Sequence, residues 1–196
     1  MSLERKSGIL LHPTSLPETP GIGTIGKQAY KFVDWLVSAQ QTIWQILPYG
    51  PTGYGDSPYA SFSTFAGNPL LIDIDMLVEA GWLSKEQANP PEWISSEGYV
   101  DFGSVVYWKI PLLKLAAQQF LDAKNNKDRV AYEAFKNDES SWLDNYSIFM
   151  SIKEYYDAKA KEEARFGAMW SNYWPRALAI HDEKAISEWH AEHHAE

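Results

Sequence analysis

Two short apolar runs separated by a helical repeat constrain the fold of this chain more than any other feature. Residues 7–12 contain one continuous apolar run, and residues 42–47 contain a second that ends at Pro48. Between them, residues 26–40 carry apolar side chains at three- and four-residue spacing, which is typical of an amphipathic helix. This order predicts a parallel βαβ unit whose continuous apolar strands are buried on both faces.

The pattern after the second run is expected to complete an α/β portion within the first 80 residues. Residues 70–74 are expected to form a short strand, and residues 76–80 a short helix. Because these elements follow the βαβ unit directly, we assign residues 1–80 to one part of the molecule.

The remaining residues, 81–196, are predicted to be helical. Ser84 and Gln87 have the spacing of a capping box, which marks the start of a helix. Three later segments carry apolar residues at helical spacing, and a fourth is polar and expected to be exposed: 111–124, 127–136, 140–161 and 183–196. We assign these elements to a second, helical part.

Composition excludes several classes of protein. The 196 residues carry a net charge of -9, with 17 basic against 26 acidic side chains, so no basic stripe is expected for a nucleic acid or an anionic membrane. The absence of cysteine excludes disulfides and thiolate metal sites and fits a reducing, cytoplasmic compartment. The apolar run near the start is far shorter than a signal sequence or a membrane span. We therefore expect a cytoplasmic globular protein that binds neither nucleic acid nor membrane.

A long loop rich in glycine, proline, tyrosine and hydroxyl side chains follows the second apolar run. Prolines and glycines recur through residues 48–69, so the loop is stiff and still reaches backbone conformations that a side chain forbids. Loops of this length in compact domains are usually functional. Tyr54 and Tyr59 offer flat apolar faces with polar tips, which suit a ligand that alternates CH faces with hydroxyls, as sugars do.

Several segments carry a specific resemblance that extends over nearly the whole chain: 5–17, 21–23, 44–73, 142–150 and 170–175. With the blocks Ser57-Pro58-Tyr59 and Gly67-Asn68-Pro69, they are similar to the amino-terminal part of a 4-alpha-glucanotransferase of the amylomaltase, or disproportionating-enzyme, family. The last two segments resemble the helical insertion that follows the second barrel strand in that family. Thr24 and Tyr49 depart from the family pattern, which usually has Asp and Leu there.

The resemblance implies a (β/α)8 TIM barrel. Residues 1–80 would then supply the first two barrel strands with their active-site loops, and residues 81–196 a helical insertion subdomain. A complete barrel needs about 250 residues and eight strands, whereas this sequence supplies two strands. We therefore expect an incomplete barrel that belongs to a larger enzyme. A small self-sufficient domain, in which the helices wrap the βαβ unit, is the alternative.

The resemblance also implies a reaction. The family transfers a segment of an α-1,4-glucan to another glucan by a retaining double displacement, and its substrates include maltooligosaccharides, starch and glycogen. Its nucleophile, acid/base Glu and stabilising Asp lie on later barrel strands, so no catalytic residue is assigned here. We expect no cofactor and no metal, and an isolated chain that is inactive without the remainder of the barrel. A non-catalytic glucan-binding module is the alternative function, and a helical interaction protein is a third.

Four loop residues are candidate substrate contacts. Because the loops after barrel strands line the active-site mouth, Tyr59 is expected to stack beneath the sugar at the cleavage point, where its ring face favours developing positive charge. The family resemblance points to the same residue. Asp56 and Ser57 are expected to hydrogen-bond sugar hydroxyls, and Tyr54 to form a platform for a more distant glucose unit. The alternatives are a Tyr59 packed under its own loop and an Asp56 that caps a turn before Pro58.

Three other patterns receive a structural interpretation. Residues 21–26 satisfy G-x-G-x-x-G, but a proline-rich segment separates them from the first strand, so we do not expect nucleotide binding. Asp73 and Asp75 are interpreted as the end of a short strand and not as a catalytic pair. His190 and His194 have a spacing that two metal ligands can use, but they are interpreted as a solvated helix end.

Overall fold

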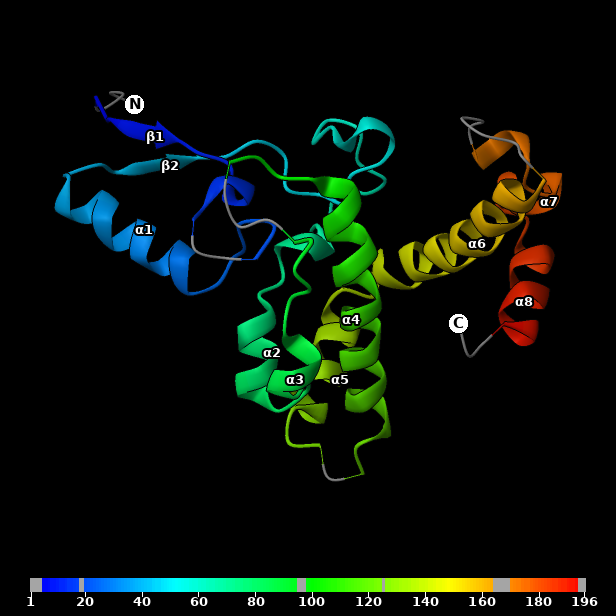
Figure 1. The fold of residues 1–196 in the computed structure, drawn as a ribbon. Helices are drawn as coiled ribbons and strands as arrows, with labels where there is room; N and C mark the ends of the chain where they lie inside the picture. The colour runs from blue at the N-terminus through cyan, green and yellow to red at the C-terminus, as the bar shows by residue number, and fades with distance from the viewer. Residues whose placement is uncertain (1–4, 18–19, 95–97, 125, 164–169, 194–196) are drawn as a thin grey trace. The chain divides into compact units, whose positions relative to one another are not determined.

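The computed structural model describes residues 5–17, 20–94, 98–124, 126–163 and 170–193. The chain forms two compact units, residues 1–127 and residues 128–196. Figure 1 shows the elements along the chain, which are mostly helices with one small sheet. In the described residues no helix is both long enough and apolar enough to span a membrane.

A two-stranded parallel sheet opens the first unit. Strand β1 (Gly8–Leu10) pairs with strand β2 (Ile43–Gln45), and Ile9 lies opposite Trp44 in the register. Helix α1 (Lys27–Ser38) connects the two strands and lies beside them (Figure 1). The parallel βαβ unit is therefore confirmed, although both strands are shorter than the apolar runs that predicted them.

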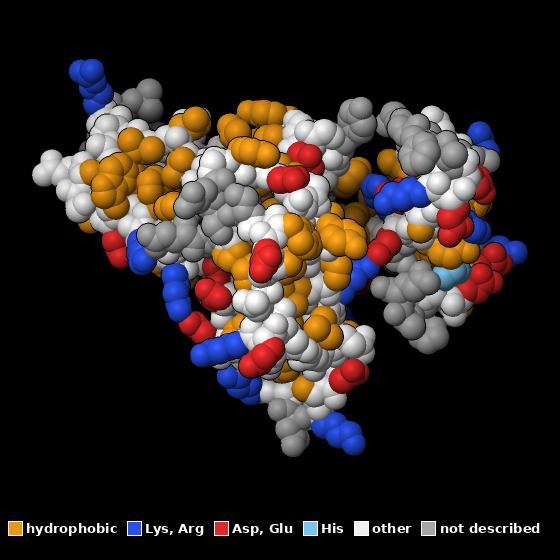
Figure 2. Space-filling view, in the orientation of Figure 1, with side chains coloured by type: hydrophobic (Ala, Val, Ile, Leu, Met, Phe, Trp, Pro, Cys, Tyr) orange, Lys and Arg blue, Asp and Glu red, His pale blue; other side chains and the backbone are white. Residues whose placement is uncertain are grey.

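The faces of this sheet are more exposed than its apolar sequence predicts. Leu10 is 58% exposed and Ile43 is 45% exposed. Helix α1 packs on the sheet through Phe32, whose ring centroid lies 4.9 Å from that of Trp44. In Figure 2, hydrophobic side chains gather on the surface formed by β1, β2 and α1. The expectation of buried strands was wrong for the described residues, because two strands and one helix cannot cover both faces of a parallel sheet.

The segment expected to be a strand at 70–74 is instead a 3-10 turn, η3 (Pro69–Leu71), followed by helix α2 (Ile74–Ala80). Asn68 Oδ1 accepts a hydrogen bond from the Leu70 amide at 2.9 Å and so caps the turn. Proline at the first position has no N–H for a sheet ladder, and its fixed φ suits a helical turn. The strand prediction was therefore wrong, and both leucines of η3 are buried by the turn.

Two further helices complete the first unit. Helix α3 (Lys85–Ala88) begins with the predicted capping box, in which the Gln87 amide donates to Ser84 Oγ and the Ser84 amide donates to Gln87 Oε1. Helix α4 (Phe102–Asp122) begins well before the expected residue 111, because Asp101 caps it. Figure 1 shows α2 and α3 beside α4. Two clusters of buried side chains form here: Ile74, Leu83, Leu112 and Ala116; and Ile22, Leu70 and Val105.

The second unit is helical. Its helices are α5 (Arg129–Asp138), α6 (Leu143–Glu162), α7 (Arg176–Ala179) and α8 (Glu183–Glu192), with a 3-10 turn η4 (Trp170–Asn172) before α7. Its core contains Ile152, Trp174, Leu178 and Trp189. Helix α8 was expected to be exposed, but it packs through Trp189, which is only 7% exposed.

Candidate functional site

The loop between β2 and η3 is held together by hydrogen bonds within itself. The Gly53 amide donates to the Ala60 carbonyl at 2.9 Å, which closes the middle of the loop. The Asn68 amide donates to the Tyr49 carbonyl at 2.7 Å, which closes its base. Two further 3-10 turns lie in this region of the unit, η1 (Pro13–Ser15) after β1 and η2 (Tyr54–Asp56) within the loop. The segment after β2 is therefore an ordered loop that is closed by its own backbone hydrogen bonds.

Tyr59 is one of the most exposed aromatic side chains of the first unit, with 73% of its surface accessible. Its backbone amide donates to Ser57 Oγ at 3.3 Å, so the hydroxyl of Ser57 supports the turn that presents Tyr59. The ring is therefore not packed beneath its own loop. A tyrosine presented in this way leaves an aromatic face available to a ligand.

Asp56 lies in the same turn with an unusual backbone conformation. Its φ is +53, and it follows Gly55, whose φ is +72. Asp tolerates the left-handed region better than most residues, and positive φ at a non-glycine residue is often found at functional sites. The alternative turn-capping role falls to Ser57, whose Oγ accepts from the Tyr59 amide, because among the described residues no backbone amide donates to the Asp56 carboxylate. The exposed Asp56 carboxylate thus retains acceptor capacity.

Tyr54 completes the set of predicted contacts. Its backbone belongs to η2, whereas its side chain lies outside the described part of the structure. The loop therefore brings Tyr59, Ser57 and Asp56 together within four consecutive positions, and the role of the Tyr54 ring stays a prediction.

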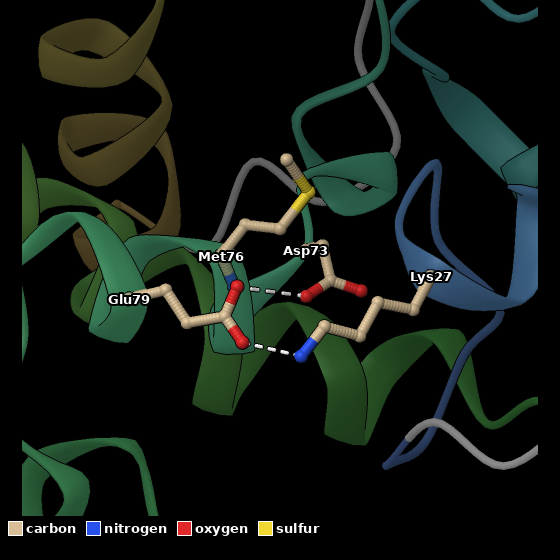
Figure 3. A network of polar contacts seen from close by, with 4 residues as sticks. All are labelled: Lys27, Asp73, Met76 and Glu79. Atoms are coloured by element: carbon tan, nitrogen blue, oxygen red, sulfur yellow. Dashed lines mark hydrogen bonds and ion pairs between the residues drawn. The ribbon is translucent and has the colours of Figure 1, made fainter.

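A buried carboxylate anchors the carboxyl end of the loop to the rest of the unit. Asp73 is 8% exposed, and its Oδ2 accepts a hydrogen bond from Thr24 Oγ1 at 2.6 Å. Its Oδ1 accepts from the Met76 amide at 3.1 Å and caps α2 (Figure 3). Beside it, Lys27 and Glu79 form an exposed ion pair that links α1 to α2 (Figure 3). Asp73 is therefore a structural residue at a helix start, and not the end of a strand as predicted.

Lys109 is a buried cation that sequence reasoning missed. It lies on α4 with 1% of its surface exposed, and its Nζ donates to the Leu70 carbonyl of η3 at 2.6 Å. Burial lowers the pKa of the amine to about 8, while the nearby Asp73 carboxylate acts in the opposite direction. The signal in the sequence was a single charge inside the apolar run from Val105 to Leu113. This contact fixes η3, and hence the end of the loop, to α4.

The glycine-rich segment 21–26 serves close packing. A Cβ on Gly23 would lie 2.1 Å from the Pro13 carbonyl oxygen, and a Cβ on Gly26 would lie 1.9 Å from Asp73 Oδ2. Both positions therefore require glycine for contact with neighbouring chain. This packing accounts for two of the three glycines of the G-x-G-x-x-G pattern.

Among the described residues no group of three side chains is suited to a metal. His190 is exposed, and His194 lies outside the described residues. His193 stacks on Trp189 with ring centroids 3.7 Å apart and an interplanar angle of 9°. The interpretation as a purely solvated helix end is therefore corrected for His193.

Comparison with known proteins identifies relatives of this chain. A family model described as 4-alpha-glucanotransferase matches residues 11–196. A 4-alpha-glucanotransferase of Thermus thermophilus is 44% identical over 188 residues, which are 96% of this chain, and one of Streptococcus pneumoniae is 46% identical over 160 residues, which are 82% of it. A solved structure, the amylomaltase from Streptococcus agalactiae in complex with acarbose, superposes with a TM-score of 0.82 at 34% identity and covers 96% of this chain.

These matches define the class of protein. The chain belongs to the 4-alpha-glucanotransferase family, as the sequence segments indicated. It spans about a third of the length of the relatives it matches, with 35% of the Thermus thermophilus protein, 31% of the Streptococcus pneumoniae protein and 36% of the solved amylomaltase chain.

Proposed function

We propose that this chain forms part of the substrate cleft of a 4-alpha-glucanotransferase that acts on α-1,4-glucans such as maltooligosaccharides, starch or glycogen. The observation that carries the proposal is the exposed Tyr59 on a folded loop directly after β2, in a chain of this family. A relative that binds acarbose supports an oligosaccharide ligand. The cysteine-free sequence supports a cytoplasmic location.

The reaction proposed is a retaining double displacement, which needs a carboxylate nucleophile and a second carboxyl group that acts as acid and then as base. Asp73 is committed to capping α2 and to Thr24, and Asp75 lies exposed in the first turn of α2. The family resemblance implies that the nucleophile and the acid/base lie on later barrel strands, and we assign the two catalytic carboxyl groups to that part of the enzyme.

The remaining barrel is the second element of the proposal. In a (β/α)8 TIM barrel, residues 1–80 would contribute the first two strands and residues 81–196 a helical insertion subdomain. The exposed apolar side chains of β1, β2 and α1 support neighbouring strands and helices that cover them.

Four side chains receive roles in this cleft. Tyr59 stacks on the sugar at the cleavage point, and its ring face stabilises the oxocarbenium-like transition state. Asp56 and Ser57 form hydrogen bonds with sugar hydroxyls, as an acceptor and as a donor or acceptor respectively. Tyr54 stacks on a glucose unit farther along the glucan.

Substitution of Tyr59 in the complete enzyme tests the proposal. Tyr59→Ala is expected to lower kcat/KM for maltotriose disproportionation by roughly two- to tenfold or more, since one aromatic face is lost. Tyr59→Phe keeps the ring and should retain most of the activity. Phe65→Ala removes another exposed aromatic ring of the same loop and serves as the control. Equal effects of Tyr59→Ala and Phe65→Ala would overturn the role of Tyr59.

The isolated chain gives a second test. Incubated with maltotriose, it is expected to form no longer maltodextrins, because the catalytic carboxyl groups are supplied elsewhere. Detectable transfer would contradict the assignment of those groups. If the complete protein binds maltooligosaccharides but transfers no glucan segment, the non-catalytic glucan-binding module is favoured instead.

A further inference from the structure

A small pocket lies in the first unit apart from the loop that carries Tyr59. Its volume is about 140 Å³, and its walls include Trp93, Ile94, Tyr99, Asp101, Ser104 and Val105. None of the residues that line it belongs to the loop at 48–69. It is formed by the start of helix α4, the segment that precedes this helix, and Gly21. Neither the family resemblance nor the proposed reaction gives it a role.

The pocket has an apolar floor and exposed aromatic walls. Ile94 and Val105 are buried, with 8% and 1% of their surfaces exposed. Trp93 is 51% exposed and Tyr99 is 83% exposed, so both rings present large apolar surface to solvent. Trp93 is supported by Tyr107, whose ring centroid lies 5.9 Å away. Exposed aromatic rings beside buried apolar side chains suit a ligand with flat CH faces.

The polar side of the pocket consists of acceptors held in place. Asp101 Oδ1 accepts from the Ser104 amide at 3.2 Å, and Asp101 Oδ2 accepts from Ser104 Oγ at 2.7 Å. The Ser104 hydroxyl hydrogen is therefore committed to Asp101, while lone pairs of both side chains stay available. A ligand that complements this side must bring hydrogen-bond donors, and hydroxyl groups are such donors.

The charge of the pocket disfavours anionic ligands. The hydrogen bonds from Ser104 hold the pKa of the Asp101 carboxyl below its usual value, so the group is ionised at neutral pH. None of the described residues that line the pocket is a lysine, arginine or histidine. A phosphate or carboxylate would meet a like charge without a compensating cation. The lining thus favours a neutral polyol.

We propose that this pocket binds one pyranose ring of an α-glucan, at a site separate from the Tyr59 loop. Drug-sized ligands occupy pockets of roughly 300–1,000 Å³, so the smaller volume here fits a single ring and not an oligosaccharide chain. The choice of an α-glucan as the source of that ring rests on the proposed function. Such a site would hold a glucan near the enzyme without taking part in its cleavage.

Titration of the 196-residue chain with maltose tests this site. The indole N–H resonance of Trp93, assigned with Trp93→Phe in proton–nitrogen NMR spectra, is expected to shift with maltose concentration. Tyr99→Ser should raise the Kd that this shift reports by about two- to tenfold, because one aromatic face is lost. Tyr30→Ser is the matched control, since Tyr30 is a 67% exposed tyrosine on α1 outside the pocket. Circular dichroism checks that each variant is folded.

Three results would overturn the site: a Trp93 resonance that does not respond to maltose, a response with the same Kd in Tyr99→Ser, or an equal response to inorganic phosphate. The experiments can refute the proposed maltose site and the proposed function independently of each other. Loss of transfer in Tyr59→Ala of the complete enzyme, together with an unresponsive Trp93, would refute the pocket and leave the cleft intact. A maltose-responsive Trp93 with transfer unaffected by Tyr59→Ala would support the pocket and refute the role of the loop.

Discussion

The side chain of Lys109 brings an amine into the interior of the first unit, where its one described hydrogen bond goes to the Leu70 carbonyl. Desolvation disfavours the charged form of such a group, and this lowers its pKa from 10.5 to about 8. The shift corresponds to about 3 kcal/mol of differential free energy between protonation states. Retention of a buried lysine at this cost is consistent with a role in fixing η3 to α4.

The pH dependence of stability tests this residue. Because the amine is less basic in the folded chain, the unfolded chain binds more protons between pH 8 and pH 10.5, and the free energy of unfolding rises across that interval. Lys109→Met should remove this rise, whereas Lys114→Met, an exposed position of the same helix, should keep it. Urea unfolding at several pH values measures the effect. The same rise in the Lys109→Met variant would refute the assignment.

The hydrogen bond from Thr24 to Asp73 supports a second prediction. Thr24→Val removes a buried donor from the carboxylate, so Asp73 is left with less compensation for its own burial. We expect the free energy of unfolding to fall by about 1–3 kcal/mol. Thr64→Val, at an exposed position, is the control and should change stability little. Chemical denaturation with a constant m-value provides the measurement, and equal stability of the two variants would contradict the prediction.

Helix α8 depends on one large side chain for its packing. Trp189 is buried beside Tyr155, with ring centroids 5.1 Å apart, and its Nε1 donates to Ser151 Oγ at 3.3 Å. Both partners belong to α6, so the tryptophan joins two helices of the second unit. The charged and polar residues around it explain why the helix was expected to be exposed.

Truncation of that side chain should release the helix. Trp189→Ala is expected to destabilise the second unit by about 3–5 kcal/mol, because a large buried aromatic group is lost. His190→Ala changes the next, exposed residue of the same helix and should have little effect. Hydrogen exchange of the α8 amides would detect the release. Unchanged protection in Trp189→Ala would show that other contacts hold the helix.

At the scale of the whole molecule, apolar side chains lie exposed on the described sheet and on α1. Exposed apolar side chains of α1 include Tyr30, Val33, Trp35 and Val37. Isolated domains seldom present a contiguous apolar surface of this kind unless another part of the protein or a partner covers it. The proposed remainder of the barrel is such a cover.

This surface predicts the solution behaviour of the isolated chain. We expect concentration-dependent self-association, which Val37→Lys should reduce because it places a charge in the exposed patch. Val130→Lys, at an 80% exposed valine of α5 outside this patch, is the control. Sedimentation velocity measures both. A chain that stays monomeric at all concentrations would contradict the prediction.

The sequence by itself determined the elements whose signals are local. The helical period at 26–40, the capping box at Ser84 and the parallel βαβ order are properties of neighbouring residues, and each was confirmed. The family followed from the loop motifs, and the matched family model agrees with it. The same loop suggested Tyr59 as a ligand contact. The glycines and prolines that flank this tyrosine are close in sequence, so its exposure could be expected from local residues alone.

Only the tertiary structure decided features that depend on distant parts of the chain. The turn at 69–71 had local signals in Asn68 and Pro69, whereas the burial of Lys109 depends on a carbonyl that η3 supplies from 39 residues away. The pocket beside Trp93 and the burial of Trp189 likewise arise from segments brought together in space. The physical reason is that periodicity and capping act over a few residues, whereas burial and polar compensation depend on whatever neighbour the fold supplies.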